Sequence, residues 1–516
     1  MAEKFKVKWL ERFAGYSDIV NAEDTPKLTK DLNNVKVRYG RLVGRGGMSK
    51  YLSISTPSSA NIIGLFNYRQ VDGSHELIRL LTTDIEHISA GAWVSIKGAL
   101  TLNGTTITRP QFTIIDDTLI YSNEGYNRPR KYAGTGVADE IAAGTAPFGK
   151  GVVAYLGFLF IFNVSSDGTF TDIYDGHRTG YYSDDWDHDW SLCGGNSRVL
   201  DETPGTWLAA VVIGRVLFCL KSDGVVTLTF SPSSSAGIAI RFQQSLLAGK
   251  SGILSPLSLD SAGQALAFYL GTDVIIYMID PNGVNGVSDP AVVELLRATI
   301  PLNKLQYARG MVNLNEDRYY LFYDRTGLAL QLLDSYVAYN YKSKEWVKGK
   351  LGKPINCCSN FQSTDQATEE LIVSTETLVE SFDSTAIDDD GVAIPSTRYW
   401  TSNWQKMDDE GWFCGARLIL ERNGFSRIRV QISTDFSPGW TWDRYFSLRG
   451  ASVDDAYVTI DSKIPPQLCE SFNIRVEFLH DTTAARTVLQ KVGFIVQPNV
   501  AQVDTRPDRS TSAMRA

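Results

Sequence analysis

The residues with the clearest potential for chemistry lie in the acidic segment SDDWDHDW, residues 183–190. Its titratable residues are Asp184, Asp185, Asp187, His188 and Asp189. Carboxylate oxygens spaced along a loop can bind Ca²⁺, but the EF-hand pattern fails because no Gly or closing Glu stands at the required offsets. Seven Asp and one Arg lie between residues 166 and 190, so we expect a solvated acidic loop without a tight divalent-cation site.

Two other polar segments could suggest ligand binding. RYGRLVGRGGMSK, residues 38–50, is rich in Gly and Arg, but Ser49 stands where a phosphate loop needs the Gly before its Lys. A turn-rich lead-in to the first strand accounts for it better than nucleotide binding. The acidic run Asp388–Asp390 is followed by Gly391, and we expect an exposed linker loop there.

Two segments are similar to the Asp-box turns of sialidase-like propellers: SSDGTF, residues 165–170, and STDFSPGWTW, residues 433–442. The Asp of such a turn stabilises a hairpin by bonding to backbone amides. The second copy departs from the motif because extra residues separate Asp435 from Gly439. Both are structural turn signals, and neither identifies a catalytic site.

Constellations typical of enzymes are missing from the sequence. The five His are scattered and form no metal-binding motif, and no G-x-S-x-G nucleophile elbow occurs. No local pattern selects the carboxylate pair that a glycosidase needs. The sequence therefore nominates no catalytic, cofactor-binding or metal-binding residue, and we expect a protein that is not an enzyme and holds no cofactor.

The six Cys are too sparse in 516 residues for a disulfide framework. They are Cys193, Cys219, Cys357, Cys358, Cys414 and Cys469. Cys357 and Cys358 are adjacent, and the strain of a vicinal disulfide ring makes their pairing unfavourable. We expect all six thiols to be free.

Composition indicates a globular, strand-rich chain. Hydrophobic residues make up 43%, charged residues 21% and aromatic residues 11%, with 43 Gly for tight turns. The net charge is −8, yet residues 1–50 carry eleven Lys or Arg against six Asp or Glu. We expect these residues to form a basic N-terminal arm, either solvated or docked on an acidic partner or DNA. The remaining chain carries −13, which argues against clamping of nucleic acid.

Between residues 51 and 395, short runs of β-branched and aromatic residues alternate with Asp, Asn and Gly turns. GFLFIFNVSSDG near residue 160 and EDRYYLFYDRTGLAL near 321 are examples. Their spacing is close to the period of about 40 to 50 residues of four-stranded propeller blades. We therefore predict a β-propeller-like domain over 51–395. A short helix is expected at SDPAVVELLRA, capped by Ser288 or Asp289, in a loop between blades.

The pattern changes after a composition shift at residues 384–397. Five better-alternating strands follow, at 416–421, 427–433, 456–461, 473–478 and 491–496. Alternation predicts sheets with one solvated face, so we expect a β-sandwich-like domain over 396–500 and a flexible tail over 501–516. The fold class is all-β.

The first residues, MAEKFKVKWLERF, lack the apolar stretch of a secretory signal, and no apolar run is long enough to span a bilayer.

The order of several segments resembles the tail nozzle proteins of short-tailed phages, also called tail tubular or packaged-DNA stabilisation proteins. The segments are LNNVKVRYGRLVGRGGM, GLFNYRQVDGSHELIRLLTTDIEHI, GAWVSIKG, TRPQFTIIDDTLIYSNEGYNRPRKYAGTG, RYWTSNWQKMDDEGWFCGARLILE and RIRVQISTD. The resemblance covers most of the chain, through loose turn-and-strand patterns.

The resemblance implies a virion structural protein, a head–tail connector component present as a hexameric ring below the head-to-tail adaptor. Its partners would be the adaptor, other tail proteins or fibres, and double-stranded DNA in transit during ejection. It would be assembled in the host cytoplasm. Arg38, Arg41 and Arg45 would then serve docking. Two alternatives stay open: a carbohydrate-active propeller of a tail, such as a depolymerase, and a cellular propeller that acts as an interaction scaffold.

Overall fold

The computed structural model describes most of the chain. The described residues are 6–10, 29–38, 41–51, 58, 60–99, 101–165, 168–170, 176–183, 186–187, 190, 197–231, 242–325, 332–362, 369–383, 388–392, 398–402, 405–421, 426–435, 439–447, 457–480 and 488–498. Two compact units divide the chain. One consists of Met1–Arg45 with Thr397–Ala516, and the other of Gly46–Ser396.

The larger unit contains seven four-stranded antiparallel sheets within the described residues. In blade order their strands are β6 (Ile62–Arg69), β7 (His75–Leu81), β8 (Ile85–Ser89) and β9 (Ala92–Ser95); β10 (Gln111–Ile115), β11 (Thr118–Ser122), β12 (Arg130–Tyr132) and β13 (Asp139–Glu140); β14 (Phe148–Tyr155), β15 (Phe158–Ser165), β16 (Thr179–Ser183) and β17 (Ser197–Val199); β18 (Trp207–Ile213), β19 (Val216–Lys221), β20 (Val225–Phe230) and β21 (Phe242–Leu246). Blades five to seven are β22 (Asp260–Ala262), β23 (Leu266–Leu270), β24 (Ile276–Asp280) and β25 (Gly283–Gly286); β26 (Arg309–Asn313), β27 (Arg318–Tyr323), β28 (Leu333–Asn340) and β29 (Glu345–Ile355); and β30 (Cys357–Phe361), β31 (Glu370–Ser374), β32 (Val379–Asp383) and β5 (Gly47–Lys50).

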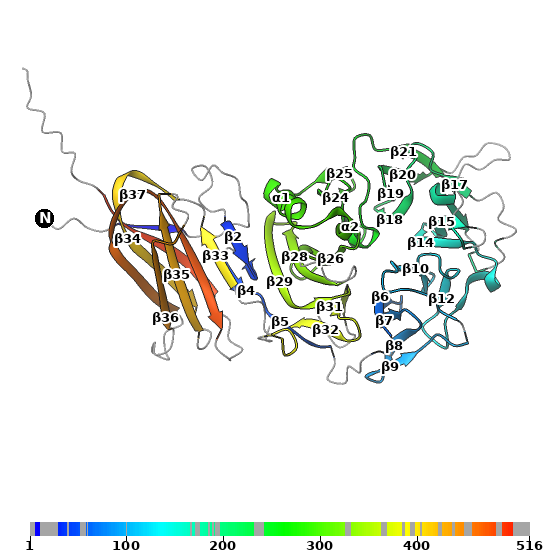
Figure 1. Ribbon diagram of the computed structural model, residues 1–516. Helices are drawn as coiled ribbons and strands as arrows, with labels where there is room; N and C mark the ends of the chain where they lie inside the picture. Colours follow the sequence, from blue (N-terminus) through cyan, green and yellow to red (C-terminus); the bar gives the residue numbers. More distant parts are fainter. Residues whose placement is uncertain are drawn as a thin grey trace, which may run out of the picture. The chain divides into compact units, whose positions relative to one another are not determined.

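These sheets form a closed ring of blades (Figure 1). Neighbouring blades meet through their first strands, in the order β6, β10, β14, β18, β22 with β23, β26 and β30, and β30 contacts β6 again. The ring is closed by β5, which comes from the start of this unit and pairs with β32 as the fourth strand of blade seven. Closure leaves only short outer edges, as expected for a propeller.

The core of the larger unit lies between adjacent blades. All eight residues of β15 are buried, because both faces of this strand pack against neighbouring sheets. Phe162 of β15 stacks on Trp207 of blade four at 4.7 Å between ring centroids. Such a pair stabilises the interface by about 0.5–1.5 kcal/mol beyond its buried area. Burial on both faces explains why the blade strands read as continuous apolar runs without alternation.

Helices are short. In the described residues they are the α-helices α1 (Pro290–Thr299) and α2 (Leu302–Leu305) and the 3₁₀ turns Ile141–Gly144, Gly176–Arg178 and Pro256–Ser258. The predicted helix is confirmed as α1, where the Asp289 side chain caps the first turn by accepting from the Ala291 N–H at 2.9 Å. It lies between blades five and six, as expected.

The smaller unit is one ten-stranded antiparallel sheet. Its strands are β1 (Lys6–Leu10), β2 (Thr29–Asn33), β3 (Val35–Arg38), β4 (Arg41–Gly44), β33 (Arg398–Ser402), β34 (Gln405–Glu421), β35 (Ser426–Thr434), β36 (Trp442–Ser447), β37 (Tyr457–His480) and β38 (Val488–Pro498). One half of β37 pairs with β34, and its other half pairs with β33 and β35. Side chains from both halves share one core, which includes Val430, Val476, Leu418 and Val492. The predicted all-β fold, a propeller with a sandwich-like unit, is therefore confirmed.

In the smaller unit the structure differs from the sequence prediction in two places, the N-terminal strands and the strand β37. The strands β2, β3 and β4 belong to the ten-stranded sheet instead of a separate arm, because β2 pairs with β33, β3 pairs with β4, and β4 pairs with β38. Arg45 is 1% exposed and cannot serve as a surface docking residue; Arg41 is exposed, and the side chain of Arg38 lies outside the described residues. The predicted strands at 456–461 and 473–478 are parts of the single strand β37.

The acidic run at 388–390 is part of the ring closure and not an exposed linker. Met48 of β5 donates its N–H to the Asp388 carbonyl at 2.9 Å and accepts from the Asp390 N–H at 2.8 Å. Asp389 is fully buried, and its carboxylate accepts from the Gly352 N–H at 2.6 Å. Asp390 pairs with Lys353. The charges of this run are therefore used to hold β5 against blades six and seven.

Asp260, the first residue of β22, gives a pH-dependent prediction. Its carboxylate accepts from the Val312 N–H of blade six at 2.6 Å, and although part of the residue is exposed, burial of the carboxyl group raises its pKa to about 6. A raised folded-state pKa means that Asp260 stabilises the fold at acid pH and that this stabilisation is lost as pH rises through about 6. We expect the Asp260→Asn variant, which keeps an acceptor oxygen, to gain up to about 3 kcal/mol relative to wild type between pH 4 and pH 8. Urea unfolding at both pH values measures this difference; an equal difference at the two values would contradict it.

The five described cysteines, Cys219, Cys357, Cys358, Cys414 and Cys469, are free thiols, and Cys193 lies outside the described residues. Consecutive side chains of a strand point to opposite faces. Cys357 accordingly packs in the core between blades seven and one, while the Cys358 sulfur lies 3.8 Å from the Gly310 carbonyl of blade six. Thiol titration after unfolding without reductant is expected to find six thiols; four or fewer would show that disulfides form.

Candidate functional site

A small pocket lies at the end of the propeller where the first strands of the blades begin. Its volume is about 240 Å³. It is lined by Ile107, Arg109, Glu124, Gly125, Tyr126, Lys150, Gly168, Phe170 and Tyr307. These residues precede β10, connect β11 to β12, begin β14, follow β15 and precede β26. Antiparallel blades place all of these segments at one end of the ring, so blades two, three and six meet at this pocket.

This pocket, which we call the axial pocket, has a polar wall that is formed by one turn. Glu124 and Gly125 have φ values of +61° and +84°, and Tyr126 donates its N–H to the Asn123 carbonyl at 3.3 Å. Two successive left-handed residues are typical of a tight hairpin turn. Gly125 is required for a second reason, because a Cβ there would lie 2.2 Å from the Phe170 ring. The turn therefore aims Glu124 across at Arg109 while Phe170 packs against its backbone.

The charges of the axial pocket are unequal. Glu124 binds Arg109 through both carboxylate oxygens: one accepts from the Arg109 backbone N–H at 3.0 Å and the other from Nε at 2.9 Å. Lys150 places its Nζ 4.9 Å from the centre of the Phe170 ring. Among the described residues Lys150 has no carboxylate partner, so the described lining carries one positive charge in excess. Tyr126, whose side chain is 47% exposed, adds an accessible aromatic face.

The space around the propeller axis is narrow. Gln111 of blade two donates its Nε2 hydrogen to the Leu208 carbonyl of blade four at 2.8 Å, crossing the inner side of blade three. Residues of blade six and of blades two and three meet in the same pocket. Both observations show that side chains of separate blades meet around the propeller axis.

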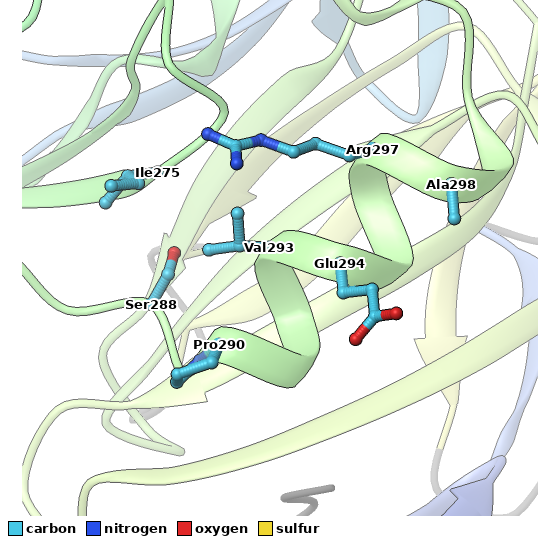
Figure 2. A pocket seen from close by; sticks show the side chains of 7 residues that line it. All are labelled: Ile275, Ser288, Pro290, Val293, Glu294, Arg297 and Ala298. Carbon is cyan, nitrogen blue, oxygen red and sulfur yellow. The ribbon is translucent and has the colours of Figure 1, made fainter. Parts of the chain in front are cut away.

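A second depression of about 570 Å³ lies beside α1. Figure 2 shows Val293 and Arg297 directed toward Ile275 and Ser288, while Glu294 points to another side. The polar groups of this depression already stabilise the fold: Arg297 donates to the Asp273 carbonyl, at 2.5 Å, and the Ser288 hydroxyl accepts from the Ile276 N–H at 2.7 Å. It is larger than the axial pocket but offers little polar chemistry.

A histidine and a carboxylate meet between blades one and two. His87 Nδ1 lies 2.9 Å from the Glu76 carboxylate and 3.3 Å from the Tyr132 hydroxyl. Tyr132 is 1% exposed, and burial together with Glu76 raises the pKa of its hydroxyl. Because the hydroxyl is buried and this cluster lines neither of the pockets described above, its groups serve to join β7, β8 and β12.

The structure places few of the sequence-predicted polar residues in a site. Asp187 forms an ion pair with Lys131 at 2.5 Å, while Asp184, Asp185, His188 and Asp189 lie outside the described residues. Asp435 accepts from the Ser471 N–H at 3.2 Å and donates its own N–H to the Ser471 carbonyl, so it fixes β35 against β37. In SSDGTF, the Ser165 hydroxyl accepts from the Gly168 N–H at 3.1 Å, and Asp167 lies outside the described residues.

No group of three or more His, Cys, Asp or Glu side chains in the described part of the chain could hold a metal ion. No described helix is long and apolar enough to cross a membrane. The lining of the axial pocket was missed by sequence reasoning because its polar residues come from separate segments with no shared motif. Two local signals lie in the lining: the Asn-Glu-Gly turn before Tyr126, and the SSDGTF segment, which supplies Gly168 and Phe170.

The pairing of the strands defines the larger unit as a β-propeller, seven-bladed in its described residues. The sequence matches no family model and no curated protein. Weak structural similarity relates the chain to three solved propeller-type proteins. SapL1 lectin in complex with α-methyl fucoside is 12% identical (TM-score 0.32; 66% of this chain and 98% of that chain covered). YCF48 from Cyanidioschyzon merolae is 11% identical (TM-score 0.35; 64% and 97%). An exo-β-1,3-galactanase from Phanerochaete chrysosporium is 9% identical (TM-score 0.26; 79% and 100%).

Proposed function

We propose that this chain is a non-enzymatic structural subunit of a short phage tail, forming the nozzle ring through which DNA passes. The observation that carries the proposal is the distribution of the segments that resemble nozzle proteins. They fall on β3–β5, on the first two blades of the propeller and on β33–β35 of the smaller unit. The resemblance thus extends over both units and over the strand that closes the propeller.

Buried charge in the larger unit supports a structural role. Arg79 pairs with Glu86 within blade one, Lys304 pairs with Asp324 at blade six, and Lys353 pairs with Glu380 and Asp390 at the ring closure. Each of these charges stabilises the architecture through a partner, as buried charges must. None of these paired residues lines either of the two pockets described above.

The narrow propeller axis is consistent with a DNA path that lies outside the single propeller. Side chains of blades two, three and six meet in the axial pocket, so we propose that DNA passes through the centre of a ring of several copies. A bore rich in Lys and Arg would bind phosphates and hold the duplex. The net charge of −13 beyond residue 50 is compatible with an acidic or neutral bore that lets DNA slide.

Cryo-electron microscopy of an intact phage particle that contains this chain tests the proposal. The expected result is a closed ring of copies, six by the resemblance, below the head-to-tail adaptor, with a bore lined mainly by neutral and acidic side chains. Location outside a tail ring, or a bore lined mainly by Lys and Arg, would overturn it. Because the subunits are acidic and repel one another, the free chain is expected to need the adaptor as a template for ring formation.

A carbohydrate-active propeller is the second candidate, and the axial pocket with its exposed Tyr126 favours it. Glycoside hydrolysis needs two carboxylates about 5–9.5 Å apart. The described lining offers one, Glu124, and Arg109 holds both of its oxygens. Incubation with polysaccharides of the host surface and assay of new reducing ends separates the two candidates: turnover supports the enzyme, and none is expected from a nozzle subunit.

A further inference from the structure

We propose that the axial pocket binds a single sugar residue that carries a carboxylate, of the hexuronic acid class, without cleaving it. This inference concerns the pocket alone and does not depend on the nozzle proposal. In a tail subunit such a site would contact an acidic surface polysaccharide. The same binding chemistry would apply if the chain were instead a carbohydrate-active or scaffolding propeller.

The size of the axial pocket sets the first limit on its ligand. Pockets for drug-sized molecules have volumes of about 300–1,000 Å³. The axial pocket, at about 240 Å³, is smaller and fits one six-membered sugar ring. A nucleotide, with a base, a ribose and phosphates, would exceed it.

The aromatic walls favour a flat ligand with an apolar face. Tyr126 is 47% exposed and stands beside Phe170 and Tyr307 in the lining. The C–H face of a pyranose ring can pack on such an aromatic face, while its hydroxyl groups point to polar neighbours. Phe170 is held in place because its ring packs against the backbone of Gly125, so this wall is formed before a ligand arrives.

The charges select an acidic sugar over a neutral one. The pair of Arg109 and Glu124 is satisfied internally, with hydrogen bonds of 3.0 and 2.9 Å. Among the described lining residues, Lys150 is therefore the cation left to bind an anion. An ammonium–carboxylate hydrogen bond is about twice as strong as a neutral one. Inorganic phosphate could also bind the Lys150 ammonium group, but it has no ring to pack on Tyr126, so a carboxylated sugar gains both contacts. Glu124, held by Arg109, can still accept a hydrogen bond from a sugar hydroxyl.

Isothermal titration calorimetry on the full chain tests the proposal with sodium glucuronate, glucose and inorganic phosphate as probes. Glucuronate is expected to bind at least fivefold more tightly than glucose and phosphate. The Lys150→Gln variant should bind glucuronate at least tenfold more weakly. Lys97→Gln is the matched control, because it removes the same charge from a partly exposed lysine beside blade one, outside the axial pocket, and it should bind as wild type does. Tyr126→Ala should weaken binding, whereas Tyr126→Phe, which keeps the ring, should not.

Melting temperatures of the variants establish that they are folded before binding is compared. Equal binding of glucose and glucuronate, or unchanged affinity in Lys150→Gln, would overturn the proposal. Tighter binding of phosphate than of glucuronate would identify a general anion site and would also overturn it. Release of reducing ends from a glucuronate oligosaccharide would overturn its non-catalytic part. None of these outcomes bears on whether the chain occupies a tail ring, so the two proposals fail separately.

Discussion

Replacement of Gly47 by alanine is expected to detach the strand that closes the propeller. A Cβ at this position would lie 1.7 Å from the Asp388 carbonyl oxygen and 2.9 Å from the Asp388 nitrogen, so backbone and not a flexible side chain blocks it. Relief of the clash must separate β5 from residues 388–390 and break the hydrogen bonds of Met48. We expect the free energy of unfolding of the larger unit to fall by about 3 kcal/mol or more.

Urea unfolding measures this loss, and hydrogen exchange locates it. Faster exchange is expected in β5 and β32, which pair with each other, before the other blades open. The matched control is Gly224→Ala, in the turn between β19 and β20, where the nearest atom to an added Cβ lies 3.7 Å away. The control is expected to change stability by less than about 1 kcal/mol. A loss in Gly47→Ala as small as that of the control would show that β5 does not hold the ring.

The Lys353→Met variant is expected to lose about 3–5 kcal/mol of stability at pH 8, because it leaves a buried carboxylate without its partner. Lys353 Nζ lies 2.7 Å from both Glu380 and Asp390, and the Glu380 side chain is fully buried. Burial raises the pKa of Glu380, and Lys353 opposes that rise. Removal of the lysine raises this pKa further, so the variant gains stability relative to wild type as pH falls and Glu380 becomes neutral.

The double variant Lys353→Met/Glu380→Leu is the sharpest comparison. If the unpaired charge causes the loss, removing both charges should recover most of it, since an apolar pair can replace a buried ion pair at little cost. Lys342→Met is the surface control, because its lysine is 71% exposed and pairs with Asp317 in solvent. It should cost less than about 1 kcal/mol. If the double variant is no more stable than Lys353→Met, the stability lost in Lys353→Met comes from altered packing and not from the unpaired Glu380 charge.

Much of the fold could be predicted from local sequence. The blade strands were recognised because β-branched and aromatic runs end at Asp, Asn and Gly turns, and both the conformation and its signal lie within a few residues. The helix α1 was equally local: Asp289 and Pro290 define its first turn whatever surrounds it. The alternating strands at 427–433 and 491–496 indicated a sheet with one core face, since alternation depends on burial of a single side.

The tertiary structure decided which segments meet. β5 pairs with β32, more than three hundred residues later in the chain, and a strand of four residues carries no mark of so distant a partner. The acidic run at 388–390 was predicted to be exposed because charged residues usually face solvent. Asp389 is instead buried and the run is paired, because Lys353, Gly352 and the β5 backbone supply its partners. In the same way Arg109, Glu124, Lys150 and Tyr307 form one pocket because the ring brings the beginnings of its blades together. Sequence alone determined the local strands, turns and helix. The axial pocket was determined by long-range strand pairing, because its residues come together only when the ring of blades closes and buries their segments.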